Sequence, residues 1–229
     1  MNKAYEVNRL RELSAEFLGS AFLAAIVIGS GIAAQQLSPD QIGLQLLENT
    51  AATVAGLYVL INVFGPVSGA HFNPIVSFAD VALGTNTLRR AFSYLPAQVA
   101  GCSLGALAAN AMFSLPLFQI STHHRATSPH FLSEIIATAG LVLVIFALSK
   151  NGGEQKIAGS VASYIGAAYF FTSSTSFANP AIAVGRMFSN SFAGIAPSSI
   201  PAFVIAEIIG GILAVLLVRF LFPRKAANV

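Results

Sequence analysis

The chain of 229 residues is 55% hydrophobic and 9% charged, with a mean hydropathy of +0.72. A water-soluble globule needs more charge to cover its surface, so the composition predicts a membrane protein. The single cysteine, Cys102, excludes an internal disulfide and a cysteine metal cluster. The isoelectric point of about 9.2 does not indicate nucleic-acid binding, because the cations are spread in pairs beside apolar segments.

Apolar segments with few charges predict six membrane-spanning helices, because a span needs roughly 20 mainly apolar residues. The charged start of the chain leads into an apolar run that is long enough to span by itself. We therefore expect a retained first helix and not a cleaved signal peptide. The expected spans cover about 11–34, 44–66, 88–113, 131–150, 156–173 and 199–222.

The twelve Lys and Arg residues predict the orientation of these spans. Arg125 and Arg186 fall on one side of the membrane, and the other ten fall on the side that carries both termini. Because positive residues accumulate on the cytoplasmic side, we expect a multi-pass protein of the cell (inner) membrane with both termini in the cytoplasm. The ten are Lys3, Arg9, Arg11, Arg89, Arg90, Lys150, Lys156, Arg219, Arg224 and Lys225.

The two halves of the chain follow the same order of motifs. Each half starts with a span that carries one glutamate near its beginning, Glu16 or Glu134, and continues with an Asn-Pro stretch. A Gly-rich span then follows, AQVAGCSLGALAAN (97–110) in the first half and AEIIGGILAVLL (206–217) in the second. Three spans per half place the second copy upside down relative to the first, which is an inverted repeat.

This repeat predicts a single domain over residues 1–229, with a first copy at about 9–114 and a second at about 130–222. Gly101 and Gly105 form a GxxxG pattern. Such a pattern lets two membrane helices approach closely, so we expect a tight helix crossing at these glycines.

Two Asn-Pro pairs, Asn73-Pro74 and Asn179-Pro180, interrupt the apolar stretches. Proline is tolerated best in the first turn of a helix and Asn is a good N-cap, so each pair predicts the start of a short helix. About ten residues span roughly 15 Å, which is half the hydrocarbon thickness. The two half-helices then enter from opposite sides, and their N-termini meet near the midplane. They are expected at about 74–84 and 180–190.

The segments before the asparagines, GPVSGAH (65–71) and TSSTSFA (172–178), are predicted to be irregular. Irregular backbone at this depth occurs only where it is buried in protein or lines a water-filled cavity. We therefore expect the backbone carbonyl groups of both segments to line a pore.

The motifs SGAHFNPI (68–75) and Asn-Pro-Ala (179–181), the six spans and the paired glutamates resemble the aquaporin, or major intrinsic protein, family over nearly the whole chain. The resemblance implies an all-α membrane protein with six transmembrane helices plus two re-entrant half-helices in an inverted repeat. It also implies a passive channel in the lipid bilayer, usually a homotetramer. We expect no cofactor and no metal, and the spacing of Ser, His and Asp indicates no catalytic group.

In this family, two Asn side chains donate hydrogen bonds to a central water, which interrupts the path of a proton. Carried over, Asn73 and Asn179 take this role, with Pro74 and Pro180 stacked at the midplane. The first motif ends in Ile75 where the family usually has Ala, and we expect only local repacking there. The residues at the pore centre are then Asn73, Pro74, Ile75, Asn179, Pro180 and Ala181.

The selectivity filter departs further from the family, which usually has Arg three residues after the second Asn where this chain has Ile182. Matched spacing places the other filter positions at Thr53, Ala167 and Ser176, with a possible slip from Ala167 to Gly166. The resemblance associates Phe, His, a small residue and Arg with strict water channels, and aromatics and Gly around the Arg with glycerol channels. This set matches neither, so we expect a wide, neutral filter.

Charged residues occur at matching positions, since Asp80 and Arg186 each lie seven residues after their Asn. They are either pore-mouth residues or half-helix ends paired with neighbours, and Arg186 would partly replace the absent filter Arg. His71 is expected to line the cytoplasmic half of the pore. We expect Glu16 and Glu134 to accept hydrogen bonds from the loops and not to carry protons.

The favoured function is a passive channel for small uncharged solutes, such as glycerol or arsenite-like metalloid hydroxides, and for water. A strict water channel, an ion-coupled secondary transporter and a junction protein with a closed pore are the alternatives. Ion coupling requires ionisable groups at the midplane, where the sequence places only Asn and hydroxyls. A loop contains His123, His124 and His130, for which a polar loop is favoured over a metal site.

Overall fold

The computed structural model describes residues 3–223, with side chains from residue 8 onward. The side chain of Lys3 and all of Arg224 and Lys225, three of the predicted cytoplasmic cations, lie outside the described residues. The regular secondary structure of the described residues is entirely helical. Its α-helices are α1 (Lys3–Leu37), α2 (Ile42–Ser68), α3 (Pro74–Ala82), α4 (Leu88–Met112), α5 (Ser128–Lys150), α6 (Glu154–Phe171), α7 (Pro180–Arg186) and α8 (Ile200–Leu221), with a short 3-10 turn at Pro197–Ser199.

The six long helices lie where the apolar segments predict them, and α3 and α7 are the two half-helices. Three boundaries differ clearly from the prediction, and the first is the start of α1, which begins at Lys3 and not near residue 11. Helix α2 continues to Ser68 and ends at Gly69, whose left-handed φ of 88° stops the helix, so only residues 69–72 form the first loop. Helix α7 ends at Arg186, well before residue 190, because the Arg186 side chain bonds to the Ala193 carbonyl and the chain folds back.

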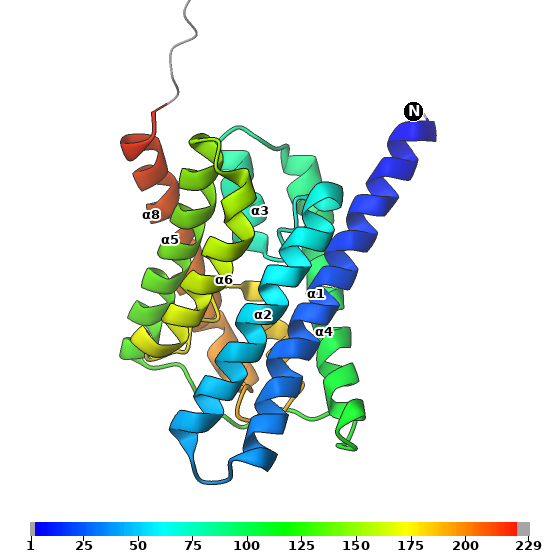
Figure 1. Ribbon diagram of the computed structural model, residues 1–229, viewed down its shortest axis with the longest axis vertical. Helices are drawn as coiled ribbons and strands as arrows, with labels where there is room; N and C mark the ends of the chain where they lie inside the picture. The colour runs from blue at the N-terminus through cyan, green and yellow to red at the C-terminus, as the bar shows by residue number, and fades with distance from the viewer. Residues whose placement is uncertain (1–2, 224–229) are drawn as a thin grey trace, which may run out of the picture.

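The helices pack in the same way in both halves of the chain. Helix α1 packs against α2 and α4, and α5 packs against α6 and α8. Each half-helix also contacts the last long helix of the other half, α3 with α8 and α7 with α4. Figure 1 shows that α1 begins and α8 ends at the same end of the bundle, and that α3 lies in the half of the bundle nearer this end.

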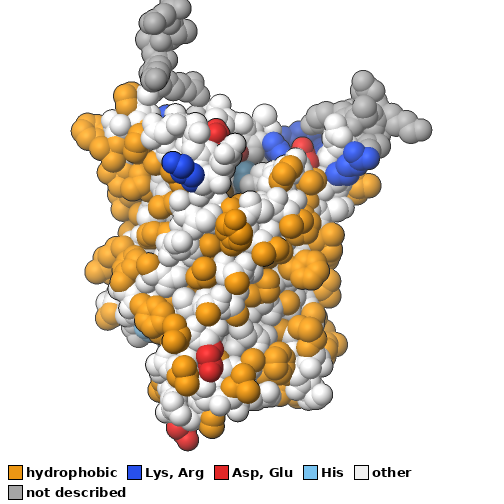
Figure 2. All heavy atoms as spheres, viewed as in Figure 1, with side chains coloured by type: hydrophobic (Ala, Val, Ile, Leu, Met, Phe, Trp, Pro, Cys, Tyr) orange, Lys and Arg blue, Asp and Glu red, His pale blue; other side chains and the backbone are white. Residues whose placement is uncertain are grey.

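The surface of the bundle suits a membrane. By length and composition, four segments are long and apolar enough to cross one, namely Asn8–Leu37, Ile42–Ser68, Ser128–Lys150 and Pro197–Leu221. Large apolar side chains such as Phe22, Val63, Leu104 and Ile212 are exposed on the outer faces of the helices. Figure 2 shows apolar side chains over the middle of the molecule and Lys and Arg at the end where the N-terminus lies.

The tightest helix crossing occurs between α1 and α4. A Cβ atom added at Gly101 would collide with the carbonyl oxygen of Phe17, and one added at Gly105 would collide with that of Ala21. A backbone atom cannot move aside as a flexible side chain can. The GxxxG pattern therefore marks a real close approach of two helix backbones.

Replacing Gly105→Ala is expected to destabilise the protein, because the added methyl would push α4 away from α1. Overpacking of this kind costs about 1–3 kcal/mol, so we expect a lower Tm in detergent. The matched control is Gly43→Ala in α2, where an added Cβ meets nothing within 4 Å. Equal Tm values for the two variants would contradict the close crossing.

Candidate functional site

The two asparagines begin the half-helices and also join them. The Asn73 side chain accepts a hydrogen bond from the Ile75 N–H (2.9 Å), and the Asn179 side chain accepts one from the Ala181 N–H (3.0 Å). Each Nδ2 then donates across the molecule, from Asn73 to the Ala178 carbonyl (2.7 Å) and from Asn179 to the Phe72 carbonyl (2.8 Å). An amide NH₂ has two hydrogens, so each Asn keeps one for a further acceptor.

The loops before the asparagines share an unusual backbone. Left-handed φ angles occur three residues and one residue before each Asn, at Ala70 (50°), Phe72 (51°), Ser176 (51°) and Ala178 (47°). Residues other than glycine rarely adopt such angles, and the strain persists only where neighbouring contacts fix the chain. Each loop therefore needs a strong anchor behind it.

Glu16 anchors the first loop. It is fully buried (0% exposed), and its carboxylate accepts hydrogen bonds from the His71 N–H (2.9 Å) and the Phe72 N–H (2.8 Å). It also accepts bonds from the Ser68 hydroxyl (2.6 Å) and the Gln98 amide (2.8 Å). Four donors around one carboxylate satisfy it without water.

Glu134 anchors the second loop in the same way, accepting bonds from the Phe177 N–H (2.9 Å) and the Ala178 N–H (2.7 Å). A second buried carboxyl group, Glu207 of α8, accepts the Asn179 N–H (2.9 Å). Sequence reasoning did not assign Glu207 a role. The signal was present, because the alignment of residues 97–110 with 206–217 puts Glu207 opposite Gln98.

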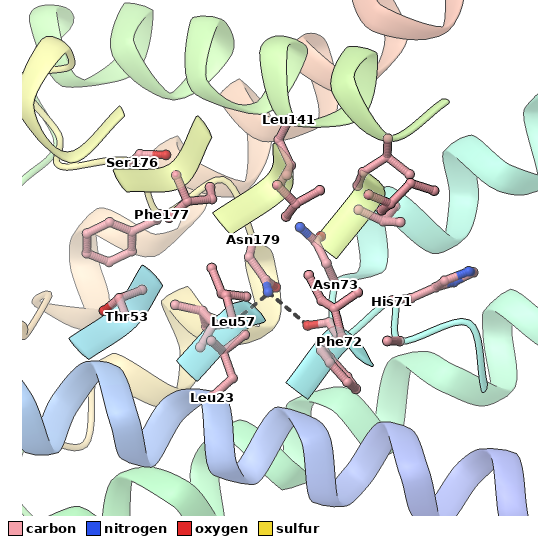
Figure 3. A pocket seen from close by; sticks show the side chains of 18 of the residues that line it. Leu23, Thr53, Leu57, His71, Phe72, Asn73, Leu141, Ser176, Phe177 and Asn179 are labelled. Atoms are coloured by element: carbon pink, nitrogen blue, oxygen red, sulfur yellow. Dashed lines mark hydrogen bonds between the residues drawn. The ribbon is translucent and has the colours of Figure 1, made fainter. Parts of the chain in front are cut away.

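A cavity of about 230 Å³ runs past both asparagines, from His71 and Asp80 at one end to Ser176 and Arg186 at the other. Figure 3 shows Asn73 and Asn179 side by side between apolar side chains, with Ser176 and Phe177 toward one end and His71 toward the other. The apolar wall comes from α1, α2, α5 and α6 and consists of Leu23, Val27, Leu57, Ile61, Leu141, Ile145, Val161 and Ile165.

Three of the four predicted filter residues line this cavity: Thr53, Ser176 and Ile182. The prediction for Ala167 does not hold, since Ala167 is exposed on the outside of α6. Gly166 does not replace it, because that position faces Val54 of α2.

Tyr169 lies beside Thr53, at the place where Ala167 was expected. It lines the cavity, is 3% exposed, and its hydroxyl lies 3.2 Å from the Thr53 hydroxyl. Tyr169 and Ala167 are two residues apart and therefore point to opposite sides of the helix. The family spacing of twelve residues before Asn179 fails here, because the pore-facing residue lies ten before it. The residues at this level of the cavity, Thr53, Tyr169, Ser176 and Ile182, carry no charge, and they include an aromatic ring.

The charged residues at the two mouths both line the cavity and contact neighbours. The Asp80 carboxylate accepts the Thr85 hydroxyl and lies 3.5 Å from Nε2 of His71. Arg186 is buried, with its guanidinium carbon 3.4 Å from the centroid of the Phe177 ring. The two alternatives left open by the sequence therefore apply together, because each residue is both a lining residue and a paired helix end.

Other predicted residues lie outside the cavity wall. Ile75 is buried against α8, where a Cβ at Gly211 would approach its side chain, so the larger residue is accommodated by a glycine. Nδ1 of His130 lies 2.8 Å from the Arg125 carbonyl oxygen. Within the described residues, no three His, Cys, Asp or Glu side chains are grouped as metal ligands would be.

Two capped half-helices that meet beside a continuous cavity, within a bundle of six long helices, define a membrane channel built on an inverted repeat. Residues 3–177 match the major intrinsic protein family. The chain is 46% identical to aquaglyceroporin AqpS of Rhizobium meliloti (strain 1021), over 94% of this chain and 92% of that protein. The chain belongs to the major intrinsic protein family.

Two further comparisons agree with this assignment. The chain is 31% identical to the human lens fiber major intrinsic protein, over 93% of this chain and 82% of that protein. The solved structure of the aquaglyceroporin from Plasmodium falciparum superposes with a TM-score of 0.70, covering 92% of this chain and 95% of that one. At 20% identity, this likeness shows the shared fold.

Proposed function

We propose that the protein is a passive channel for small uncharged solutes, including glycerol and metalloid hydroxides such as arsenous acid, and for water. The observation that carries the proposal is the cavity that passes both asparagines and ends in a filter of mixed chemistry. The similarity to a bacterial aquaglyceroporin supports the same substrate class.

The filter presents hydroxyls beside apolar surface. Thr53, Tyr169 and Ser176 contribute hydroxyl groups, and Ile182 and Phe177 contribute apolar surface. The Ser176 hydroxyl is buried and has no hydrogen-bond partner among the described residues. A polyol carries hydroxyls along a carbon chain, so it can bond to one side of such a filter and pack against the other.

Ions are excluded by the same geometry. The N-termini of α3 and α7 point toward the middle of the cavity, and their dipoles place partial positive charge there. Arg186 adds a full positive charge beside the filter. Asn73 and Asn179 cannot ionise, so the side chains of the described residues that line the centre of the cavity offer no group to couple solute movement to a proton gradient.

We also infer the setting of the channel. The Lys and Arg residues at the end that carries the N-terminus support cytoplasmic termini in the inner membrane (Figure 2). Each chain contains its own cavity, which fits a homotetramer with one pore per subunit, held in the lipid bilayer by its apolar outer faces.

Stopped-flow light scattering of proteoliposomes tests the proposed function. We expect solute-driven reswelling with glycerol and arsenous acid, at a rate that a pH or sodium gradient does not change. A rate that follows either gradient would indicate a coupled transporter. Shrinkage and reswelling at the rate of empty liposomes would indicate a closed, structural protein, and water flux without glycerol flux would indicate a strict water channel.

Replacing Arg186→Ala is expected to change selectivity. The substitution removes the positive charge beside the filter and the stacking on Phe177, so we expect a higher cation leak and an altered glycerol rate. The measurement is the decay of a potassium gradient in proteoliposomes, alongside reswelling. Arg186→Lys keeps the charge and serves as the control. Unchanged leak and flux in a folded Arg186→Ala protein would exclude Arg186 from the filter.

A further inference from the structure

The anchors behind the two asparagines differ in one residue. In the first half, the Gln98 amide donates to Glu16 (2.8 Å). The matching position on α8 is Glu207, which has no N–H to donate to Glu134. The other donors match: backbone N–H groups one and two residues before each Asn, and a serine hydroxyl five residues before it, from Ser68 or Ser174.

Glu207 and Glu134 are both completely buried (0% exposed). They accept successive backbone N–H groups of one loop, Glu134 those of residues 177 and 178 and Glu207 that of residue 179, so the two carboxyl groups are neighbours that interact directly. Oε1 of Glu207 accepts the Asn179 N–H (2.9 Å). Its Oε2 accepts no hydrogen bond from any N–H or O–H group of the described residues. Two carboxylates in contact, away from water, cannot both stay ionised, so a proton between them is the only inexpensive arrangement.

We propose that Glu207 is a positioning residue for the second Asn-Pro loop and that it is a neutral carboxylic acid, whose O–H group donates a hydrogen bond to Glu134. One oxygen then holds the Asn179 backbone, and the other supplies the fourth donor that Glu134 would otherwise lack. A proton on Glu207 thus does in the second half what the Gln98 amide does in the first. The expected effect on flux rests on the proposed channel function.

The charges around the pair are consistent with one ionised carboxylate. Arg186 of α7 and Arg125 of the loop before α5 place positive charge near Glu134, and the Tyr164 phenol of α6 also interacts with it. Glu134 therefore has cations to balance its charge, whereas the group that acts on Glu207 is Glu134 itself. The proton accordingly belongs on Glu207.

The proposal predicts how the pair responds to substitution and pH. Glu207→Gln replaces the O–H donor by an N–H donor of nearly the same shape, so the loop stays in place at every pH. Glu207→Ala leaves both the Asn179 N–H and Glu134 without a partner, and we expect glycerol flux to fall at least about fivefold. Because the natural bond needs a proton, it exists at low and neutral pH and is lost when the pair ionises at high pH.

Infrared difference spectroscopy tests the proton directly and does not depend on conduction. The spectrum of the full-length protein minus that of Glu207→Gln should contain the carbonyl band of a protonated carboxylic acid at neutral pH. Without that band, the proposal is wrong. If the band is present but no protein conducts, a lower Tm for Glu207→Ala than for Glu207→Gln still supports the positioning role, and only the proposed function fails.

Flux measurements complete the test, with Gln98→Glu as the matched variant in the first half. We expect wild-type glycerol flux to fall reversibly as the pH is raised to strongly alkaline values, and Glu207→Gln to retain it. Gln98→Glu, which puts a second carboxyl group beside Glu16, should show a larger alkaline loss than wild type. Identical pH profiles for wild type and Glu207→Gln, or full flux in Glu207→Ala, would overturn the proposal.

Discussion

Replacing Ile182→Arg is expected to reduce glycerol flux about tenfold or more, while water still passes. A tenfold reduction corresponds to a barrier for glycerol that is higher by about 1.4 kcal/mol. Ile182 is 4% exposed and provides apolar surface in the filter. A guanidinium there would occupy the space beside Tyr169 and Thr53 and would add a second positive charge one helical turn before Arg186. The passage becomes narrower and more polar, which favours water over a polyol.

The ratio of glycerol to water permeability in proteoliposomes measures this effect. Ile182→Val is the matched control, because it keeps an apolar branched side chain and should leave the ratio nearly unchanged. A folded Ile182→Arg channel with the wild-type ratio would show that the filter lies elsewhere along the cavity.

Glu16→Ala is expected to abolish the folded protein. The substitution leaves four buried donors without an acceptor: the Ser68 hydroxyl, the His71 and Phe72 N–H groups and the Gln98 amide. Each unsatisfied buried group costs about 1–3 kcal/mol, and a whole domain is stable by only about 5–15 kcal/mol. Gel filtration in detergent should show aggregated protein or none.

Two control variants separate the anchor from a general effect of charge. Glu12→Ala on the same helix removes a partly exposed carboxylate that pairs with Arg90 (3.1 Å), and such a pair is worth only about 0–1 kcal/mol. Glu16→Gln keeps the shape of the side chain but places an NH₂ group against hydrogen-bond donors. We therefore expect its Tm to lie between those of wild type and Glu16→Ala. If Glu16→Ala has the Tm of wild type, the loop does not depend on this anchor.

The fold could be predicted because its signals are local and repeated. Apolar length defined the six long helices, and Pro74 and Pro180 after a capping Asn defined the starts of the two half-helices. The pairing of Gly105 with the α1 backbone follows the GxxxG pattern. Each of these features depends on a few neighbouring residues, and the inverted repeat supplied a second copy as a check.

The filter could be predicted only in part, because it depends on distances through irregular chain. Thr53 lies on a long helix and Ile182 on a capped half-helix, so counting from the asparagines placed both beside the cavity. Ala167 is separated from Asn179 by the loop 172–178, and the length of this loop decides which face of α6 lines the pore. A shift of two residues turned Ala167 outward and brought Tyr169 in, which changed a wide filter into one with an aromatic ring.

The charged residues at the ends of the half-helices show a second limit of prediction from sequence. The sequence identified Arg186 and Asp80 as matching positions but could not choose between a pore mouth and a paired helix end. That choice depends on where Phe177 and His71 lie in space, and both come from the strained loops. The role of Glu207 could not be predicted, because it depends on contacts with Glu134 and Asn179, which are distant in the sequence.

The most direct test of the account is to block the cavity from within. Cys102, the single cysteine of the chain, is buried and does not line the cavity, so an introduced Ser176→Cys provides a thiol that faces the cavity. Labelling it with a bulky thiol reagent should abolish glycerol reswelling in proteoliposomes, while labelled Ala167→Cys on the outer face of α6 should conduct as before. Undiminished glycerol flux through fully labelled Ser176→Cys would contradict a conducting path past the two asparagines.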